Sequence, residues 1–227
     1  MNMKQRDFIF VLVSATLLLT FGGCATESSQ SLAIKQVDVA NKPFSGLRTP
    51  ISIGKFDNRS SFMRGIFSDG TDRLGSQAKT ILITHLQQTN RFNVLDRENL
   101  SEISQEATIG NKTQKLKGAD YVVTGDVTEF GRKEVGDQQL FGLLGRGKSQ
   151  IAYAKVNLNI VNTLTSEVVF SSHGAGEYAL SNREVIGFGG TASYDSTLNG
   201  KVLDLAIREA VNRLTAAIDN GEWQPNK

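Results

Sequence analysis

The stretch most suggestive of chemistry is GLLGRGKS, Gly142 to Ser149, which has the Gly-x-x-x-x-Gly-Lys-Ser spacing of phosphate-binding loops. In such a loop the phosphates are held by backbone amides at the start of a helix, so a helix has to follow the loop. The residues that follow here, AYAKVNLNIVN, alternate between apolar and polar side chains, which predicts a strand. We therefore expect a flexible hairpin tip that binds no nucleotide.

Other catalytic patterns are sparse. The two histidines, His85 and His173, have no cysteine or glutamate at metal-ligand spacing, and the chain contains no Gly-x-Ser-x-Gly elbow. Asp69 and Asp72 stand before a predicted helix, where carboxylates stabilise the positive end of the helix dipole. We expect that the protein is not an enzyme, holds no metal and needs no cofactor.

The N-terminus has the features of a secretory signal peptide over residues 1–23. Lys4 and Arg6 precede an apolar run over 8–21, and two small glycines follow it. The run is shorter than the roughly 20 residues that a helix needs to cross a bilayer, so removal is expected rather than retention. Cys24 is the only cysteine and stands directly after the expected cleavage site.

Composition limits the class of protein. The hydrophobic and charged contents, 39% and 21%, are those of an ordinary folded domain. The net charge is +2 and no Lys/Arg stripe is present, so nucleic acid is a poor candidate partner. About 200 residues remain after cleavage, which is enough for one domain with a sizeable core.

Hydrophobic periodicity predicts an α+β domain. Residues 24–48 are polar and are expected to be a tether, and the folded domain is expected over 49–223, with a short tail at 224–227. Ser68 and Asp69 are cap candidates for the first helix, and Asp96 is the cap candidate for the second. The expected strands lie near 51–56, 91–96, 119–127, 152–162 and 168–172, and the expected helices near 74–86, 97–107 and 198–218.

Five segments, in this order, resemble the CsgG family, whose type member is the curli secretion channel. They are ISIGKFDNRS, AKTILITHLQQTNRFNVLDRENLSEISQE, GADYVVTGDVTEFG, YAKVNLNIVNTLTSEVVFSSHGAGEY and KVLDLAIREAVNRL. Cys24 then matches the lipobox of bacterial lipoproteins, with Phe21 where Leu is usual, and is the expected lipidation site. Ala25 after the cysteine argues for sorting to the outer membrane.

The resemblance implies a lipid-anchored outer-membrane protein whose main domain lies in the periplasm. Channel members of the family assemble as homo-oligomeric rings in which each subunit adds two β-hairpins to a shared transmembrane barrel. They export unfolded fibre subunits of the curli type without a nucleotide, and accessory lipoproteins are further candidate partners. The hairpins would fall at about 130–153 and 174–201.

The two hairpin segments differ in how well they fit a bilayer. A crossing strand needs about 9–11 residues and an uncharged lipid-facing side. The first segment carries Glu129, Arg132, Lys133 and Glu134 on both sides of its outgoing strand, so it fits only if the crossing part begins late. The second begins at Gly174 and Gly176, and its lipid-facing candidates are Tyr178, Leu180, Ile186, Phe188 and Tyr194.

The family has its pore constriction in a loop before the first long helix. The candidates here are Phe67, Asp69 and Phe62, with Phe67 first, because aromatic rings can contact an extended chain without reading its sequence. Phe67 could equally be a hydrophobic staple that packs against the start of the helix.

Two functions follow and both stay open at this level. One is an oligomeric secretion channel. The other is a non-pore periplasmic lipoprotein of the same family that acts as an envelope-assembly or binding module, with the two glycine-rich segments as surface loops.

Replacement of Phe188 by Arg tests the second hairpin. If the segment crosses the bilayer, the charge should block membrane assembly, because Arg on the lipid face near the midplane costs about 2–4 kcal/mol. The measurement is the yield of oligomer extracted from membranes. A normal yield would contradict the channel hypothesis.

Overall fold

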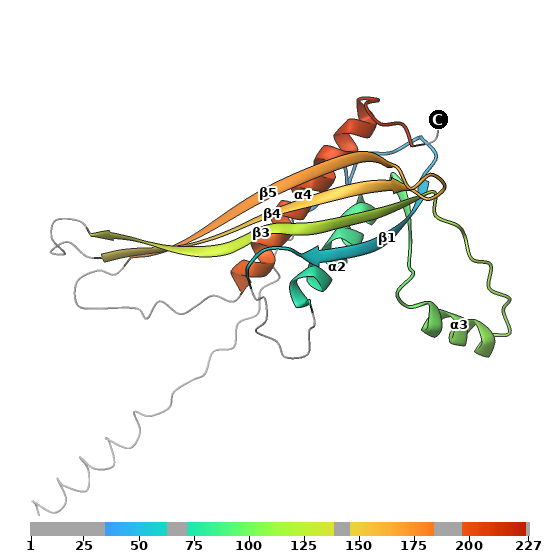
Figure 1. The fold of residues 1–227 in the computed structure, drawn as a ribbon, viewed down its shortest axis with the longest axis horizontal. Coiled ribbons are helices and arrows are strands. Elements are labelled where there is room, and N and C mark those ends of the chain that lie inside the picture. The colour runs from blue at the N-terminus through green and yellow to red at the C-terminus, as the bar shows by residue number, and fades with distance from the viewer. Residues whose placement is uncertain (1–34, 63–71, 139–145, 184–196, 226–227) are drawn as a thin grey trace, which may run out of the picture. The chain divides into compact units, whose positions relative to one another are not determined.

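The computed structural model describes residues 35–62, 72–138, 146–183 and 197–225. The described part from Gln36 onward forms one compact unit. It has a mixed α+β fold, built on one five-stranded sheet in the order β2-β1-β3-β4-β5 (Figure 1). The α+β class expected from the sequence is confirmed.

The first half of the sheet is parallel. β1 (Thr49–Asn58) pairs with β2 (Phe92–Leu95) on one side and with β3 (Tyr121–Gln138) on the other. Parallel strands need crossover connections, and these contain α2 (Arg73–Gln88) and α3 (Leu100–Ile109). The change from period 2 to period 3.6 along the chain predicted this succession of strands and helices.

The second half is an antiparallel meander of long strands. β4 (Arg146–Asn162) pairs with β3 over the whole ladder from Tyr121↔Asn162 to Gln138↔Arg146. β5 (Val168–Arg183) pairs with β4 down to Gly147↔Arg183. A bulge between Val127 and Glu129 shifts the register of β3.

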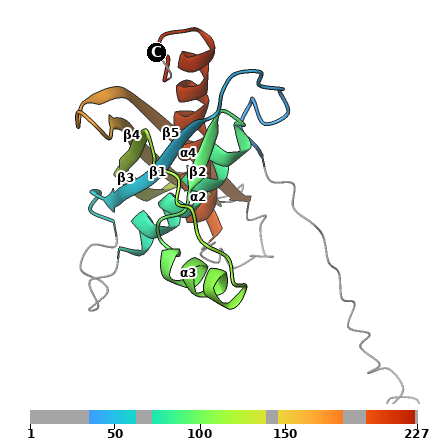
Figure 2. The same ribbon diagram turned by 90° about the vertical axis from the view of Figure 1, so that its right-hand side faces the viewer.

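Helices α2 and α4 (Thr197–Asp219) cover the same face of the sheet, α2 over β1 and α4 over β4 and β5 (Figures 1 and 2). Every second residue of β4 from Ala152 to Ile160 is buried in the core between these helices and the sheet. Burial of each large apolar side chain contributes about 1.5–3 kcal/mol, so this layer dominates the stability. Its fully buried members include Ile51, Leu82, Leu86, Val123, Val127, Val156, Leu158, Ile160, Leu203, Ile207 and Leu214.

Both early helices start later than their cap candidates indicate. The N-cap of α2 is Asp72, whose carboxylate accepts from Gly75 N (2.8 Å) and from Asn58 N (2.6 Å). Ser68 and Asp69 lie outside the described residues. The N-cap of α3 is Asn99 rather than Asp96, and hydrogen bonds from the Asn99 side chain and from the backbone of Glu98 and Asn99 lower the pKa of Asp96.

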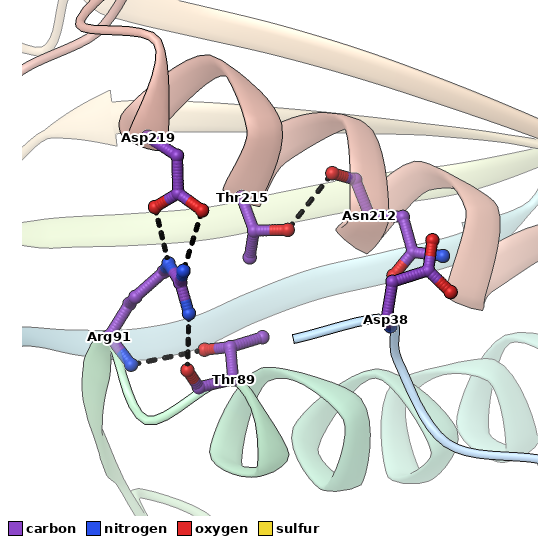
Figure 3. Close-up of polar contacts among 6 residues, drawn as sticks. All are labelled: Asp38, Thr89, Arg91, Asn212, Thr215 and Asp219. Atoms are coloured by element: carbon purple, nitrogen blue, oxygen red, sulfur yellow. Dashed lines mark hydrogen bonds and ion pairs between the residues drawn. The ribbon is translucent and has the colours of Figure 1, made fainter. Parts of the chain in front are cut away.

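The expected tether differs from the structure from Gln36 onward. Val37 and Val39 are buried, with 3% and 6% of their surfaces exposed. Asp38 lies beside Asn212 of α4, whose Oδ1 accepts from the Asp38 backbone N at 3.0 Å (Figure 3). The alternation of Val37 and Val39 was the signal for this packing, but two residues are too few to predict an element.

Two polar links tie distant elements together. Arg91, 4% exposed, donates from Nε and Nη2 to the Asp219 carboxylate at 2.9 and 2.6 Å and from Nη1 to Thr89 O at 2.8 Å (Figure 3). His85 of α2 lies 2.8 Å from Asp204 of α4 through Nε2. Arg91 and His85 are both buried, so loss of the carboxylate would leave a buried polar group without that partner, and both links help to fix how α4 sits on α2 and at the start of β2.

The closest approach in the fold is that of α4 to β5. A Cβ on Gly174 would lie 2.0 Å from Ala206 O and 2.6 Å from Ala210 N, and a Cβ on Gly176 would lie 2.9 Å from Val202 O. Both glycines are buried under the helix backbone. Only a residue without a side chain fits at these two positions.

Replacement of Gly174 by Ala should therefore destabilise the protein by about 3 kcal/mol, the upper end for overpacking, because the opposing atoms are helix backbone and cannot turn away. The measurement is the urea midpoint at constant m-value. Gly118→Ala is the matched control, since no atom lies within 4 Å of its added Cβ, and a change within about 0.5 kcal/mol is expected. Equal midpoints for the two variants would contradict the packing.

Candidate functional site

The three long strands continue past the helical layer (Figure 1). The first described turns of α4 reach β3 and β5, where Asn199 accepts from Arg132 Nε at 2.8 Å and Lys201 Nζ lies 5.3 Å from the centre of the Tyr178 ring. Beyond this level each strand runs on for about six residues, on the order of 20 Å. We call these residues the extension, and they are 133–138, 146–151 and 179–183.

The extension has two open edges. β1 pairs with β3 only as far as Val127, and among the described residues no strand pairs with the outer edge of β3 beyond it. β5 is the last strand of the sheet, so its outer edge is likewise unpaired within the described ranges. Rows of unpaired N–H and C=O groups on long strands are templates for pairing with another chain.

Of the four charges in the outgoing strand of the first hairpin, Glu129 and Arg132 belong to the body of the domain, whereas Lys133 and Glu134 fall in the extension. The bulge brings Glu129 opposite Lys155, and their side chains form an ion pair at 2.9 Å. Arg132 is bonded to α4, and Phe130 is 4% exposed. The hairpin expected over 130–153 is present as a β-hairpin, but its part beyond the helices begins after Arg132 and returns at Ile151.

The second segment differs more from expectation. Gly174 and Gly176 lie under α4, and residues 197–201 form the first described turns of that helix, so both ends of the expected hairpin segment belong to the helix-covered part of the domain. Tyr178 is 39% exposed below Lys201, and Leu180 lies within β5. The other lipid-facing candidates lie outside the described residues: Ile186, Phe188 and Tyr194.

Of the constriction candidates, only Phe62 lies in the described part. Its ring packs on Phe130, with 4.7 Å between centroids, and its carbonyl oxygen accepts from Asn58 Nδ2 at 2.8 Å. Phe62 therefore packs against the domain core. Phe67, Asp69 and the lipidation candidate Cys24 lie outside the described residues.

The phosphate-loop pattern is followed by a strand, as expected. Arg146 to Ser149 are the first residues of β4, and they pair antiparallel with β3 and β5. Gly142 and its next three residues lie outside the described ranges. A helix N-terminus is therefore not available after Lys148 to hold phosphate.

The sheet face opposite the helices carries a shallow hollow of about 640 Å³ at the base of the extension. Its floor and walls come from alternate positions of three strands, and its polar members are Glu129, Lys133, Tyr153, Lys155 and Glu177. The alternation of apolar and polar residues in β4 was visible in the sequence. Which residues of β3 and β5 lie beside them follows only from the register of the strands. The hollow is open, unlike the enclosed pockets that bury most of the surface of a small molecule.

Both histidines have polar partners within the domain. His85 contacts Asp204, and His173 Nε2 accepts from Arg213 Nη1 at 2.8 Å. Within the described ranges no three His, Cys, Asp or Glu side chains gather closely enough to hold a metal ion. In the same part of the chain, no helix has the length and apolarity to span a membrane.

Comparison with known proteins gives the family. The model of the curli production assembly/transport component CsgG matches residues 32–226. The chain belongs to the CsgG family. A relative of Neisseria meningitidis serogroup B, named "Putative lipoprotein NMB1126/NMB1164", is 71% identical over 225 residues, covering 99% of this chain and 100% of the relative.

Several solved structures are similar at low identity. The PelC dodecamer from Paraburkholderia phytofirmans is 14% identical, with a TM-score of 0.35 over 73% of this chain and 87% of its own. Lipoprotein GNA1162 from Neisseria meningitidis is 14% identical, with a TM-score of 0.36 over 76% and 99%. A neuraminyllactose-binding hemagglutinin homolog from Helicobacter pylori is 14% identical, with a TM-score of 0.43 over 79% and 92%.

Replacement of Phe62 by Ala tests whether this residue serves the core. Loss of the ring pair with Phe130 should lower the free energy of unfolding by about 1–2 kcal/mol. The measurement is urea unfolding, with Phe62→Leu as the control that keeps most of the apolar volume and should lose less. An unchanged unfolding curve for Phe62→Ala would contradict the packing role and favour an exposed role in the constriction.

Proposed function

We propose that the protein is an outer-membrane lipoprotein that is anchored through acylated Cys24 and forms an oligomeric secretion channel. Membership of the CsgG family supports the transport role, and the 71% identical relative supports the lipid anchor through its name. The main domain lies in the periplasm in this proposal. The exported substrate is an unfolded extracellular fibre subunit of the curli type, and no nucleotide takes part.

The observation that carries the proposal is the pair of open edges on the extension. A bilayer has no water to satisfy unpaired backbone groups, so strands can enter it only when every edge is paired. Copies of this chain arranged in a ring can pair the β3 edge of one copy with the last strand of the next. Closure of the ring removes all free edges at once, which a single subunit cannot achieve.

A second candidate function is a non-pore envelope lipoprotein of the same family that works as an assembly or binding module. It is supported by the described part of the extension, which has about six residues per strand, whereas a strand that crosses a bilayer needs about 9–11. The burial of Gly174 and Gly176 under α4 points the same way. In this candidate the hollow at the base of the extension is the contact surface.

Electron microscopy of the acylated protein extracted in detergent, with planar-bilayer conductance on the same sample, separates the two. The channel predicts rings that conduct, and the Phe188→Arg variant is the matched control that should fold without conducting. Well-folded particles without conductance would contradict the channel and leave the non-pore lipoprotein.

A further inference from the structure

Helix α3 is exposed on all sides in the isolated chain. None of its ten residues is buried, although Leu100, Ile103 and Ala107 follow helical spacing. Ile103 is 40% exposed, Ile109 66%, and Leu116 in the segment after the helix 61%. Isolated helices shorter than about 12–15 residues are marginal in water, so a surface that covers α3 would stabilise it.

A second apolar patch lies at the turn between β4 and β5. Leu164 is 93% exposed and Val168 53% exposed. Hydrogen bonds hold the turn. Asn162 N donates to Glu167 O at 2.9 Å, and Leu164 N donates to Asn162 Oδ1 at 2.8 Å. The exposure of Leu164 is therefore imposed by an ordered turn.

These two patches hold five of the seven large hydrophobic residues that are exposed in the described part of the chain. We define the α3 patch as Ile103, Ile109 and Leu116 and the turn patch as Leu164 and Val168. Single exposed apolar residues need no explanation, but two ordered groups that account for most of the exposed set indicate interaction surfaces.

The patches cannot meet within one molecule. The α3 patch follows β2, which is one edge of the sheet, and Val168 opens β5, which is the other edge. Both patches lie toward the end of the sheet where β3 starts, since Thr163 of the turn donates to Asp120 O. α3 and the β4–β5 turn are well separated in both views of the fold (Figures 1 and 2).

We infer that the α3 patch of one copy docks on the turn patch of the next copy of this chain. Different patches on opposite edges make a head-to-tail contact, which generates rings when the rotation closes. Charge supports this partner at the Leu116 end of the α3 patch, where Lys115 and Lys117 flank the leucine while Glu167 stands beside Val168; Glu102 stands beside Ile103 at the other end. The inference rests on the oligomer of the proposed function and names the contact that holds its subunits side by side on the periplasmic side.

Paired cysteines test the contact directly. Cys24 is the only native cysteine and is occupied by lipid in the proposed form. The full-length protein with Ile109→Cys and Val168→Cys, treated in membranes with a short bis-maleimide, should give a ladder of multimers on a denaturing gel. Each single variant should give none, because a head-to-tail contact does not bring two copies of one position together.

A matched control pair combines Ile109→Cys with Leu47→Cys. Leu47 is 83% exposed but belongs to neither patch, so this pair should give no ladder. Charge reversal adds an independent readout. Lys117→Glu, added to the Ile109→Cys and Val168→Cys protein, should lower the cross-linking yield about two- to fivefold, the range for an exposed ion pair. Further addition of Glu167→Lys should restore the yield.

The outcomes separate this contact from the channel. An amine cross-linker could capture oligomers of a protein whose Ile109→Cys and Val168→Cys pair gives no cross-link. That result would overturn the contact but would not contradict the channel. A ladder without conductance would support the contact and overturn the channel. Cross-linking of position 109 to another protein, or a chain that stays monomeric with both reagents, would overturn the contact.

Discussion

The close approach of α4 to β5 is the constraint on which the rest of the domain depends. Gly174 and Gly176 let the backbone of the helix lie directly on the strand, so the helix can bury its apolar face against both β4 and β5. From that position α4 also contacts α2, and the two helices form one layer over the sheet. The same contact decides where the helical cover ends and where β3, β4 and β5 continue alone.

Polar groups then set the orientation of this layer. Asp204 lies between His85 and Arg208, and Asp219 binds the buried Arg91 guanidinium through both oxygens. Hydrogen-bonded charges of this kind are directional, whereas apolar packing tolerates sliding. They link α4 to α2 and to the start of β2, elements that are more than a hundred residues apart in the chain.

The candidate functional surfaces are the parts of the domain whose backbone edges are unpaired or whose apolar side chains are exposed. At one end the strands leave the helical layer with both edges unpaired, and at the other the α3 patch and the turn patch expose large apolar groups. A monomer leaves all of these unsatisfied, since it can neither pair its edges nor bury patches that lie apart. In the proposed ring, copies of the chain would pair the open edges and cover both patches in one arrangement.

The sequence by itself determined the order and type of the elements, the strand after the phosphate-loop pattern and the family, because these rest on local periodicity and on motifs read along the chain. The starts of the helices were less well placed: of the two carboxylates expected before the first helix it is Asp72 that caps it, through Gly75 N, and the second helix is capped by Asn99 rather than Asp96. Only the tertiary structure decided that Gly174 and Gly176 belong under α4, that Phe62 packs on Phe130 and that α3 stays uncovered. Each of these depends on which residues meet across long separations in the chain, and that information is held in the packing of the whole domain.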